Sequence, residues 1–180
     1  ITPDYDLDIM KPDQDLFDVT VNVMLGMREV LINSAPDLVL VHGDTTTTMA
    51  VSLAAFYLQI PVGHVEAGLR TYNLRSPFPE ELNRQFTSRV TDYHFAPTEQ
   101  TRANLLAEDV SDKQIIVTGN TVIDALLSIL DKARQASFSV ELLKLLPFLA
   151  ECSLPRIVLV TGHRRENFGG GFEEICQALH

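Results

Sequence analysis

The chain has 180 residues, of which 46% are hydrophobic and 21% are charged. This composition is typical of a soluble globular protein and excludes a disordered or fibrous one. The 24 Asp and Glu residues outnumber the 14 Lys and Arg residues, so the formal net charge is −10. Because nucleic-acid backbones are bound mainly by basic residues, this charge argues against a nucleic-acid partner.

Short apolar runs alternate with helix-length segments along the chain. Strands are predicted over residues 38–41, 60–65, 93–96, 115–117 and 157–160. Several of these runs are continuous and β-branched, which is typical of strands buried on both faces of a parallel sheet. Helices are predicted over residues 16–32, 46–58, 80–90, 98–107, 121–136 and 140–149. This alternation predicts right-handed βαβ crossovers and an α/β fold with a doubly wound parallel sheet.

A domain boundary is predicted near residues 150–155. A helix ends there, Pro155 interrupts the chain, and a new apolar strand leads into Thr161. We expect a first domain over 1–153 and the start of a second over 154–180, because so short a segment cannot bury a core alone. The chain begins without Met, and it stops at His180 inside an apparent helix that follows the glycine-rich loop, so we expect both ends to be cut.

Other features argue against a membrane, a disulfide framework and a metal site. No apolar run approaches the ~18 residues of a membrane-spanning helix, and no signal-peptide pattern opens the chain. Cys152 and Cys176 lie far apart in the chain and suit a reducing cytosol. The histidines are scattered singly, without the spacing of zinc ligands. We therefore expect a cytoplasmic protein with no metal and no membrane partner.

Polar residues gather at the carboxyl ends of the predicted strands, where open parallel sheets bind ligands. These segments are His-Gly-Asp at 42–44, His-Val-Glu at 64–66, Gly-Asn at 119–120 and Gly-His-Arg-Arg-Glu at 162–166. Three of the five histidines fall in them, each near a carboxylate. We expect a functional site at this edge of the sheet.

Two of these segments have a structural interpretation beside the functional one. The threonines at 45–48 suit a polar ligand at a helix N-terminus, which we favour, but Asp44 or Thr45 can instead cap the following helix. His64 and Glu66 share one face of an extended segment and can form an acid/base pair. A core histidine beside a surface glutamate is an equal alternative.

Two further segments are open in the same way. Composition alone favours Glu80 and Glu81 as acids that complement a helix dipole. The glycines and arginines of 162–171 can bind a phosphate group or form a solvated loop. That loop matches neither the P-loop nor the dinucleotide-binding fingerprint.

Five motifs stand out when these segments are taken together. They are H-G-D-T-T-T-T at 42–48, G-H-V-E-A-G-L-R at 63–70, S-P-F-P-E-E-L-N-R at 76–84, T-G-N-T-V-I-D-A at 118–125 and T-G-H-R-R-E-N at 161–167. In combination they closely resemble the bacterial non-hydrolysing UDP-N-acetylglucosamine 2-epimerases. The resemblance implies two Rossmann-like domains in the glycosyltransferase-B arrangement, with the active site in the cleft between them. On that pattern the chain holds most of the first domain and only the opening of the second.

The resemblance also implies a reaction. The family interconverts UDP-N-acetylglucosamine (UDP-GlcNAc) and UDP-N-acetylmannosamine (UDP-ManNAc), which feed cell-surface polysaccharide synthesis. It eliminates UDP to form a 2-acetamidoglucal, reprotonates C2 from the opposite face and adds UDP back. This chemistry needs a base, an acid and charge stabilisation on the departing diphosphate, but no cofactor. The family usually forms homodimers, so we expect a homodimer.

Carried over residue by residue, the resemblance names Asp44, Glu66 and Glu80 as the acid/base carboxylates. It therefore overturns the preference for a purely structural Glu80. His163 is expected to contact the diphosphate or to assist proton transfer, and the substrate is expected to be bound by Asp44, Glu66 and His163. The neighbouring residues 164–165, both Arg, are expected to bind phosphate or to be structural. Because half of the cleft is missing, we expect the chain alone to be inactive.

The sequence departs from the family pattern at two places, and other functions stay open. Tyr72 stands where the family usually has Gly, and Lys-Pro-Asp at 11–13 lies in a segment linked to regulatory nucleotide binding in some members. The alternatives are the hydrolysing relative that releases ManNAc and UDP, and a sugar-nucleotide-binding module without turnover. A metallophosphatase is disfavoured because the Asp-x-His and Asn-His-Glu parts of such metal sites are missing.

Overall fold

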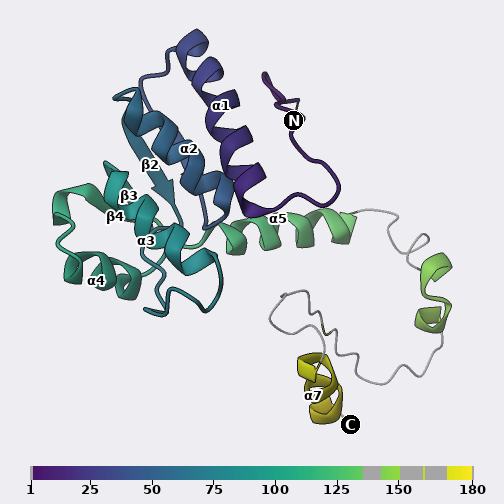
Figure 1. The fold of residues 1–180 in the computed structure, drawn as a ribbon. Coiled ribbons are helices and arrows are strands. Elements are labelled where there is room, and N and C mark those ends of the chain that lie inside the picture. Colours follow the sequence, from purple (N-terminus) through teal and green to yellow (C-terminus); the bar gives the residue numbers. More distant parts are fainter. Residues whose placement is uncertain (1, 136–142, 151–159, 161–169, 180) are drawn as a thin grey trace. The chain divides into compact units, whose positions relative to one another are not determined.

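The structure is a computed structural model that describes residues 2–135, 143–150, 160 and 170–179. The chain divides into two compact units, Ile1–Ile123 and Asp124–His180. The first unit carries a sheet and the helices packed on it (Figure 1). The second carries most of α5 (Thr121–Gln135), the 3-10 helix η2 (Pro147–Ala150) and α7 (Gly170–Leu179). The boundary predicted between residues 153 and 154 lies outside the described residues.

The sheet of the first unit is parallel throughout. Its strands are β1 (Val39–His42), β2 (Val62–Val65), β3 (Tyr93–Ala96) and β4 (Ile115–Val117), in the order β1-β2-β3-β4. Each agrees with a predicted strand to within two residues, and the α/β class with a Rossmann-like parallel sheet is confirmed. Residues 157–159 of the fifth predicted strand lie outside the described residues.

Side chains cap the N-termini of three helices in the first unit. The helices of this unit are α1 (Leu16–Ser34), α2 (Thr46–Tyr57), α3 (Glu80–Val90) and α4 (Glu99–Ala107), with a short 3-10 helix, η1 (Asp112–Gln114), before β4. Asp15, Thr45 and Thr98 accept hydrogen bonds from backbone N–H groups in the first turns of α1, α2 and α4. These helices and α5 agree with the predicted ranges to within two residues.

One predicted helix is interrupted. The sequence predicts a helix over 140–149, whereas residues 143–145 are helical and Pro147–Ala150 form η2. Pro147 has no backbone N–H to continue an α-helix, and its ring clashes with the preceding turn. The prediction overlooked this proline. Residues 140–142 lie outside the described residues.

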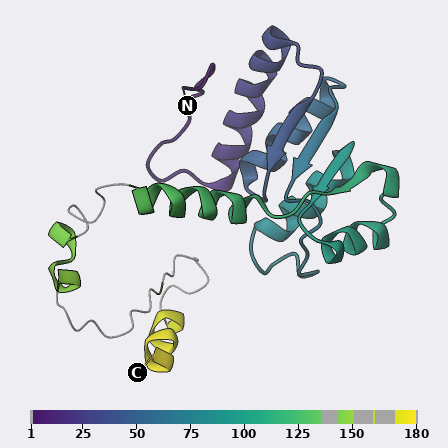
Figure 2. The same ribbon diagram turned by 180° about the vertical axis from the view of Figure 1, so that it is seen from behind.

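Helices α1 to α4 cover one face of the sheet, as the two opposite views show (Figures 1 and 2). Right-handed crossovers between strands that follow one another in order place the connecting helices on the same side. Side chains alternate accordingly, because Val39 and Val41 are buried while Leu40 between them is 61% exposed. The small Ala54 and Ala55 of α2 pack against these valines, which lets the helix lie close to the strands.

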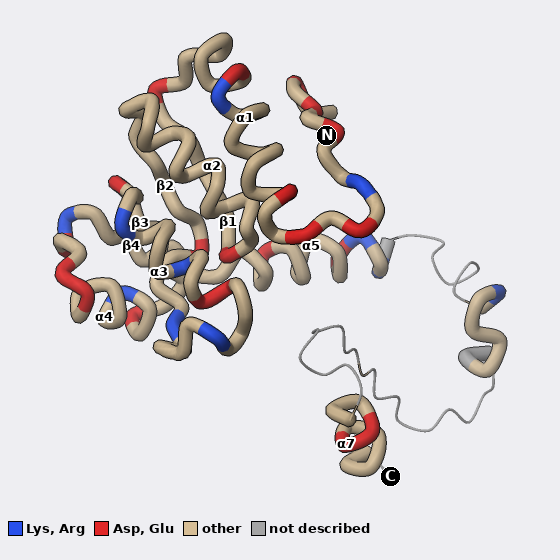
Figure 3. The backbone as a smooth tube through the Cα atoms, in the orientation of Figure 1, with Lys and Arg blue, Asp and Glu red and all other residues tan. Residues whose placement is uncertain are grey.

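Charge is unevenly distributed along the first unit. Acidic residues are frequent between residues 4 and 18, in the segment before α1 and in its first turn (Figure 3).

None of the helices in the described part of the chain is both long enough and apolar enough to cross a bilayer.

Two histidines are buried side by side beneath the helices. His64 on β2 and His94 on β3 pair across the sheet and are 0% and 1% exposed. Burial lowers the pKa of both, and that of His94 falls from 6.5 to about 4. The nearby charges of His64 and Arg70 lower the pKa of His94 further, against smaller opposite effects of Thr91 and Asp92. Both rings are therefore neutral near pH 7.

We expect the free energy of unfolding to fall by about 2 kcal/mol between pH 8 and pH 5 because of His94. In the unfolded chain this side chain takes up a proton near its ordinary pKa of 6.5, whereas the folded chain does so only near pH 4. Acid therefore stabilises the unfolded state across this window. Urea unfolding of the 180-residue chain at several pH values measures the effect.

The matched variant is His94→Gln, whose stability at pH 8 serves as its own baseline. Between pH 8 and pH 5, the free energy of unfolding of this variant should fall by about 2 kcal/mol less than that of the wild type. Equal pH dependence in the two proteins would contradict a neutral, buried His94.

Candidate active site

The ends of β1 and β2 lie next to each other at the carboxyl edge of the sheet. The Gly43 N–H, just after β1, donates to the Val65 carbonyl at the end of β2 at 3.1 Å. Gly43 has a φ of 75°, a conformation that favours glycine, so the chain turns sharply as it leaves the sheet. Asp44 follows β1 at this turn, and Glu66 directly follows β2.

Asp44 is held by an arginine from a distant part of the chain. Arg84, on the second turn of α3, donates from Nη2 and Nε to the same oxygen, Oδ2, of Asp44 at 2.7 and 3.0 Å. The neighbouring Asn83 donates from its side chain to the Asp44 backbone carbonyl at 2.8 Å. Both the carboxylate and the backbone of Asp44 are thus tied to α3.

The same arginine contacts a second carboxylate. Arg84 Nη1 donates to Glu81 Oε2 at 3.0 Å, and Glu81 is 0% exposed. Glu81 also accepts from the backbone N–H groups of Thr71 and Tyr72 and from the Gln85 side chain. Burial raises the pKa of Glu81, but these hydrogen bonds outweigh it and leave that pKa below its ordinary value. Glu81 is therefore an ionised structural group that joins the 71–72 loop to α3.

Glu66 occupies a strained backbone position. Its φ of 69° lies in the left-handed region, which costs a non-glycine residue about 1–2 kcal/mol. Its Oε2 lies 3.4 Å from His42 Nε2, and its side chain is partly exposed. Strained residues of this kind cluster at functional sites, where the surrounding structure holds them.

Downstream of Glu66, a buried ion pair fixes the chain. The side chain of Arg70 is fully buried and donates from Nε and Nη2 to the two oxygens of Glu108 at 2.7 and 2.9 Å. Its Nη2 also donates to Ser88 Oγ on α3 at 2.8 Å. The loop that begins at Glu66 is therefore anchored to α3 and to the end of α4.

Glu80 differs from its neighbour Glu81. It is the first residue of α3 and is only partly buried, whereas Glu81 is fully buried. Because residues four apart share a helix face, Glu80 lies on the side of α3 that carries Arg84. Asp44, Glu66 and Glu80 therefore come from three segments that Arg84, the β1–β2 contact and α3 hold together.

His64 does not form an acid/base pair with Glu66. The predicted common face requires an extended chain, but β2 ends at Val65 and Glu66 turns away with a positive φ. The buried His64 ring lies with Nε2 2.7 Å from the Gly43 carbonyl, and burial lowers its pKa. It acts as a core histidine that supports the turn before Asp44.

The threonines after Asp44 are partly structural. Thr45 caps α2 by accepting from the Thr48 N–H at 3.2 Å, and Thr48 Oγ1 donates to the His42 carbonyl at 2.7 Å. The capping alternative therefore holds for Thr45. The ligand-binding interpretation of the run stays a prediction, and it now concerns Thr46 and Thr47.

The remaining predicted site segments give less information. Asn120 accepts from the Val122 N–H at 3.0 Å and so caps α5. His163, Arg164 and Arg165 lie outside the described residues. Among the residues that are described, no three His, Cys, Asp or Glu side chains gather as metal ligands.

Sequence reasoning missed the roles of Glu81, Asn83 and Arg84, although all three belong to a quoted motif. The available signal was the i,i+3 spacing of Glu81 and Arg84, which puts an acid and a base on one helix face. It could not reveal that Arg84 also reaches Asp44, 40 residues earlier in the chain.

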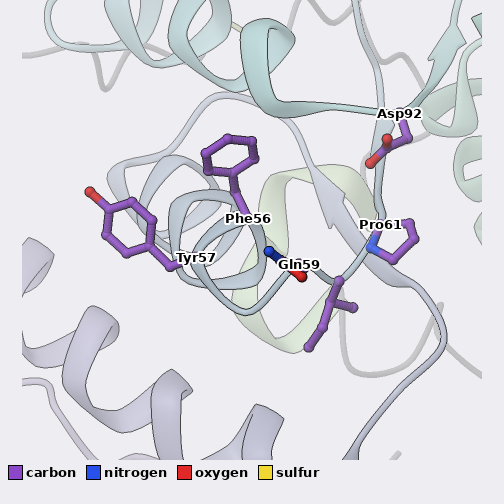
Figure 4. A pocket seen from close by; sticks show the side chains of 6 residues that line it. Phe56, Tyr57, Gln59, Pro61 and Asp92 are labelled. Atoms are coloured by element: carbon purple, nitrogen blue, oxygen red, sulfur yellow. The ribbon is translucent and has the colours of Figure 1, made fainter.

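One hollow of the first unit lies away from these carboxylates. It has a volume of about 480 Å³ and is lined by Phe56, Tyr57, residues 59–61 and Asp92 (Figure 4). These residues end α2 or precede β2 and β3, so the hollow lies at the amino edge of the sheet. Ligands of open parallel sheets bind at the opposite edge, so we place the candidate site at the carboxylates and not at this hollow.

The chain is similar to a family of known enzymes over its whole length. The family model described as UDP-N-acetylglucosamine 2-epimerase matches residues 1–180. The UDP-N-acetylglucosamine 2-epimerase of Salmonella typhimurium is 57% identical over 180 residues, which are 99% of this chain and 47% of that protein. The enzyme of the same name from Escherichia coli K12 is 56% identical over the same shares. The chain thus spans about half the length of the curated relatives it matches.

Solved structures agree with this similarity. The crystal structure of UDP-GlcNAc 2-epimerase from Neisseria meningitidis bound to UDP-GlcNAc superposes with a TM-score of 0.92 at 52% identity, over 99% of this chain and 48% of that one. The Methanocaldococcus jannaschii UDP-GlcNAc 2-epimerase in complex with UDP-GlcNAc and UDP gives a TM-score of 0.75 at 38% identity, over 80% of this chain and 39% of that one.

The departure at Tyr72 predicts backbone strain that a glycine would relieve. Tyr72 has a φ of 59° and is 61% exposed, so its side chain contributes little packing while its backbone adopts a conformation that favours glycine. We expect Tyr72→Gly to be more stable than Tyr72→Ala by about 1 kcal/mol, because both lose the ring and only glycine relieves the strain. Thermal or urea unfolding of the two variants measures the difference. Equal or lower stability of the glycine variant would contradict a strained backbone at this residue.

Proposed function

This chain belongs to the UDP-N-acetylglucosamine 2-epimerase family, and we propose that it forms one half of the active site of an isomerase that interconverts UDP-GlcNAc and UDP-ManNAc. One observation carries the proposal. Asp44 lies two residues after β1 and Glu66 directly follows the adjacent parallel β2, and α3 reaches the same edge through the contact of Arg84 with Asp44. The similar Neisseria meningitidis protein, whose structure is bound to UDP-GlcNAc, supports the choice of substrate.

The proposed reaction is non-hydrolysing and starts with loss of UDP. A carboxylate removes the C2 proton, the C2–H electron pair forms a C1=C2 double bond, and the C1–O bond breaks, so that UDP leaves with its electron pair. A carboxylic acid then protonates the resulting 2-acetamidoglucal on the opposite face of C2, and a UDP oxygen re-forms the bond to C1. The sugar is neither oxidised nor reduced overall. Proton transfer by positioned carboxyl groups typically contributes 10²–10⁴-fold to such steps.

We assign the proton transfers to Asp44, Glu66 and Glu80. Each is at least partly accessible, and each belongs to a segment held at the carboxyl edge of the sheet. His163 is proposed to contact the diphosphate or to assist proton transfer, with the arginines at 164–165 as phosphate ligands.

The wider architecture is part of the proposal. Residues 1–153 form the first Rossmann-like domain, and 154–180 begin a second that closes the cleft in the glycosyltransferase-B arrangement. The enzyme acts as a homodimer and supplies UDP-ManNAc for cell-surface polysaccharides. The coverage of about half of each curated relative supports a cleft that the 180 residues do not complete.

Exchange of the C2 proton in D2O tests the function. We define the completed chain as these 180 residues joined to the parts of the Salmonella typhimurium relative that they do not match. Proton NMR of UDP-GlcNAc with the completed chain should show loss of the C2 proton signal and formation of UDP-ManNAc. The 180-residue chain alone should leave the spectrum unchanged, because half of the cleft is missing.

Other outcomes of this experiment select the alternatives. Free ManNAc as the main product would support the hydrolysing relative. Binding of UDP-GlcNAc by the completed chain without exchange would support a binding module. Exchange by the 180 residues alone would contradict the incomplete cleft but not the reaction.

Two glutamates at equivalent helix positions separate catalysis from helix stabilisation. Glu80 begins α3 and Glu99 begins α4, so both interact with a helix dipole, and Glu99 is a surface residue. We expect Glu80→Gln to lower kcat of the completed chain at least 100-fold and Glu99→Gln to lower it less than about twofold. Both variants should lose about 0.3–1 kcal/mol of stability. Equal kcat in the two variants would show that Glu80 is only a helix-dipole partner.

A further inference from the structure

The geometry points to Arg84 as a positioning residue for the proposed reaction: it holds one oxygen of Asp44 so that the other faces the sugar. This inference rests on the proposed function. It assigns a role to a residue that neither the sequence motifs nor the family resemblance gave one.

The two oxygens of Asp44 have different surroundings. Oδ2 accepts both hydrogen bonds from Arg84, at 2.7 and 3.0 Å. Among the described residues, none donates to Oδ1. The side chain of Asp44 is 31% exposed, whereas that of Arg84 is 14% exposed. The guanidinium thus occupies the inner side of the carboxylate and leaves an oxygen accessible from solvent. A proton acceptor that must meet one sugar carbon benefits from such a fixed orientation.

Arg84 is itself held in place. Its Nη1 donates to Glu81, and Glu81 is fixed by the Thr71 and Tyr72 backbone N–H groups and by Gln85. Glu81 is fully buried, so it has no solvent to compete for these donors. The planar guanidinium can serve both carboxylates at once because its N–H groups point along two different edges. A lysine ammonium in its place cannot reproduce this two-edged contact.

The chain contains a second arginine with the same pattern of contacts. Arg102 on α4 uses Nε and Nη2 to bind one oxygen of Asp112, at 2.9 and 2.7 Å, and Nη1 to bind Glu99 three residues earlier. Its partners, Glu99 at the start of α4 and Asp112 in η1, do not come directly after a strand. Neither is one of the proposed catalytic carboxylates. Arg102 therefore provides a matched control for the loss of such an arginine.

The first test compares Arg84→Met with Arg102→Met in the completed chain. Arg84→Met should lower kcat and the rate of C2 exchange about 10–100-fold, as for other residues that orient a reacting group, while KM changes less than about threefold. Arg102→Met should change kcat less than about twofold. An unchanged kcat in Arg84→Met, or an equal loss in both variants, would overturn the positioning role.

A double-mutant cycle distinguishes positioning from general stabilisation. If Arg84 acts through Asp44, its substitution should have little further effect once the carboxylate is removed. The exchange rates of Asp44→Ala and of the double variant Asp44→Ala/Arg84→Met should then agree within about threefold. The same 10–100-fold loss in the Asp44→Ala background would overturn the inference.

Two further variants keep the test decisive if Arg84→Met does not fold, because that change leaves the buried Glu81 charge unpaired. Arg84→Lys retains the positive charge, and Glu81→Gln/Arg84→Met removes both charges. Each should show the same fall in kcat with little change in KM, and wild-type kcat in either would contradict the inference.

A spectroscopic measurement is independent of turnover. In the 180-residue chain, the Arg84 Nε–H resonance should shift on Asp44→Ala, and that of Arg102 should not. An unmoved Arg84 resonance would exclude the contact. A completed wild-type chain without C2 exchange would instead overturn the proposed function, and with it the catalytic meaning of Arg84.

Discussion

The ion pairs of Arg84 connect the parts of the chain from which the candidate site is built. One edge of the guanidinium binds Asp44 after β1, and the other binds Glu81, which holds the loop at Thr71 and Tyr72. The turn after β1, the 71–72 loop and α3 are thereby fixed around one planar cation. A buried charge of this kind is stable only while all its partners are present, so the position of α3 and the geometry of Asp44 depend on each other.

At the same edge of the sheet, buried side chains hold the loops in which Glu66 adopts a strained backbone conformation. The neutral His64 lies under the Gly43 turn with Nε2 2.7 Å from its carbonyl, and Arg70 anchors the chain beyond Glu66. Between these supports, Glu66 is kept at a positive φ that a free chain would rarely adopt. The placement of the Glu66 carboxylate thus lowers the stability of the fold, which is typical of residues that serve a reaction.

Much of the fold could be predicted because its signals are local. Continuous β-branched runs marked β1 and β4, and a capping threonine marked the start of α4, so the predicted ranges agree with the structure to within two residues. The edge that carries the candidate carboxylates followed from the parallel order of the strands. The helix predicted over 140–149 agrees with the structure at 143–145 but not from Pro147 on, because its apolar periodicity outweighed that single proline in the prediction.

The sequence by itself determined the α/β class, the elements of the first unit and the family. Strand runs, helix caps and motifs each depend only on residues that are close together in the sequence. It left His64 open between acid/base and core roles, and composition placed Glu80 and Glu81 together as helix-dipole partners. Only the tertiary structure separated them: Glu81 is buried among four donors, Glu80 is only partly buried, and His64 lies under a turn. The physical reason is that burial and long-range contacts, such as the one joining residues 40 apart in Asp44 and Arg84, arise only when the strands and α3 are packed together.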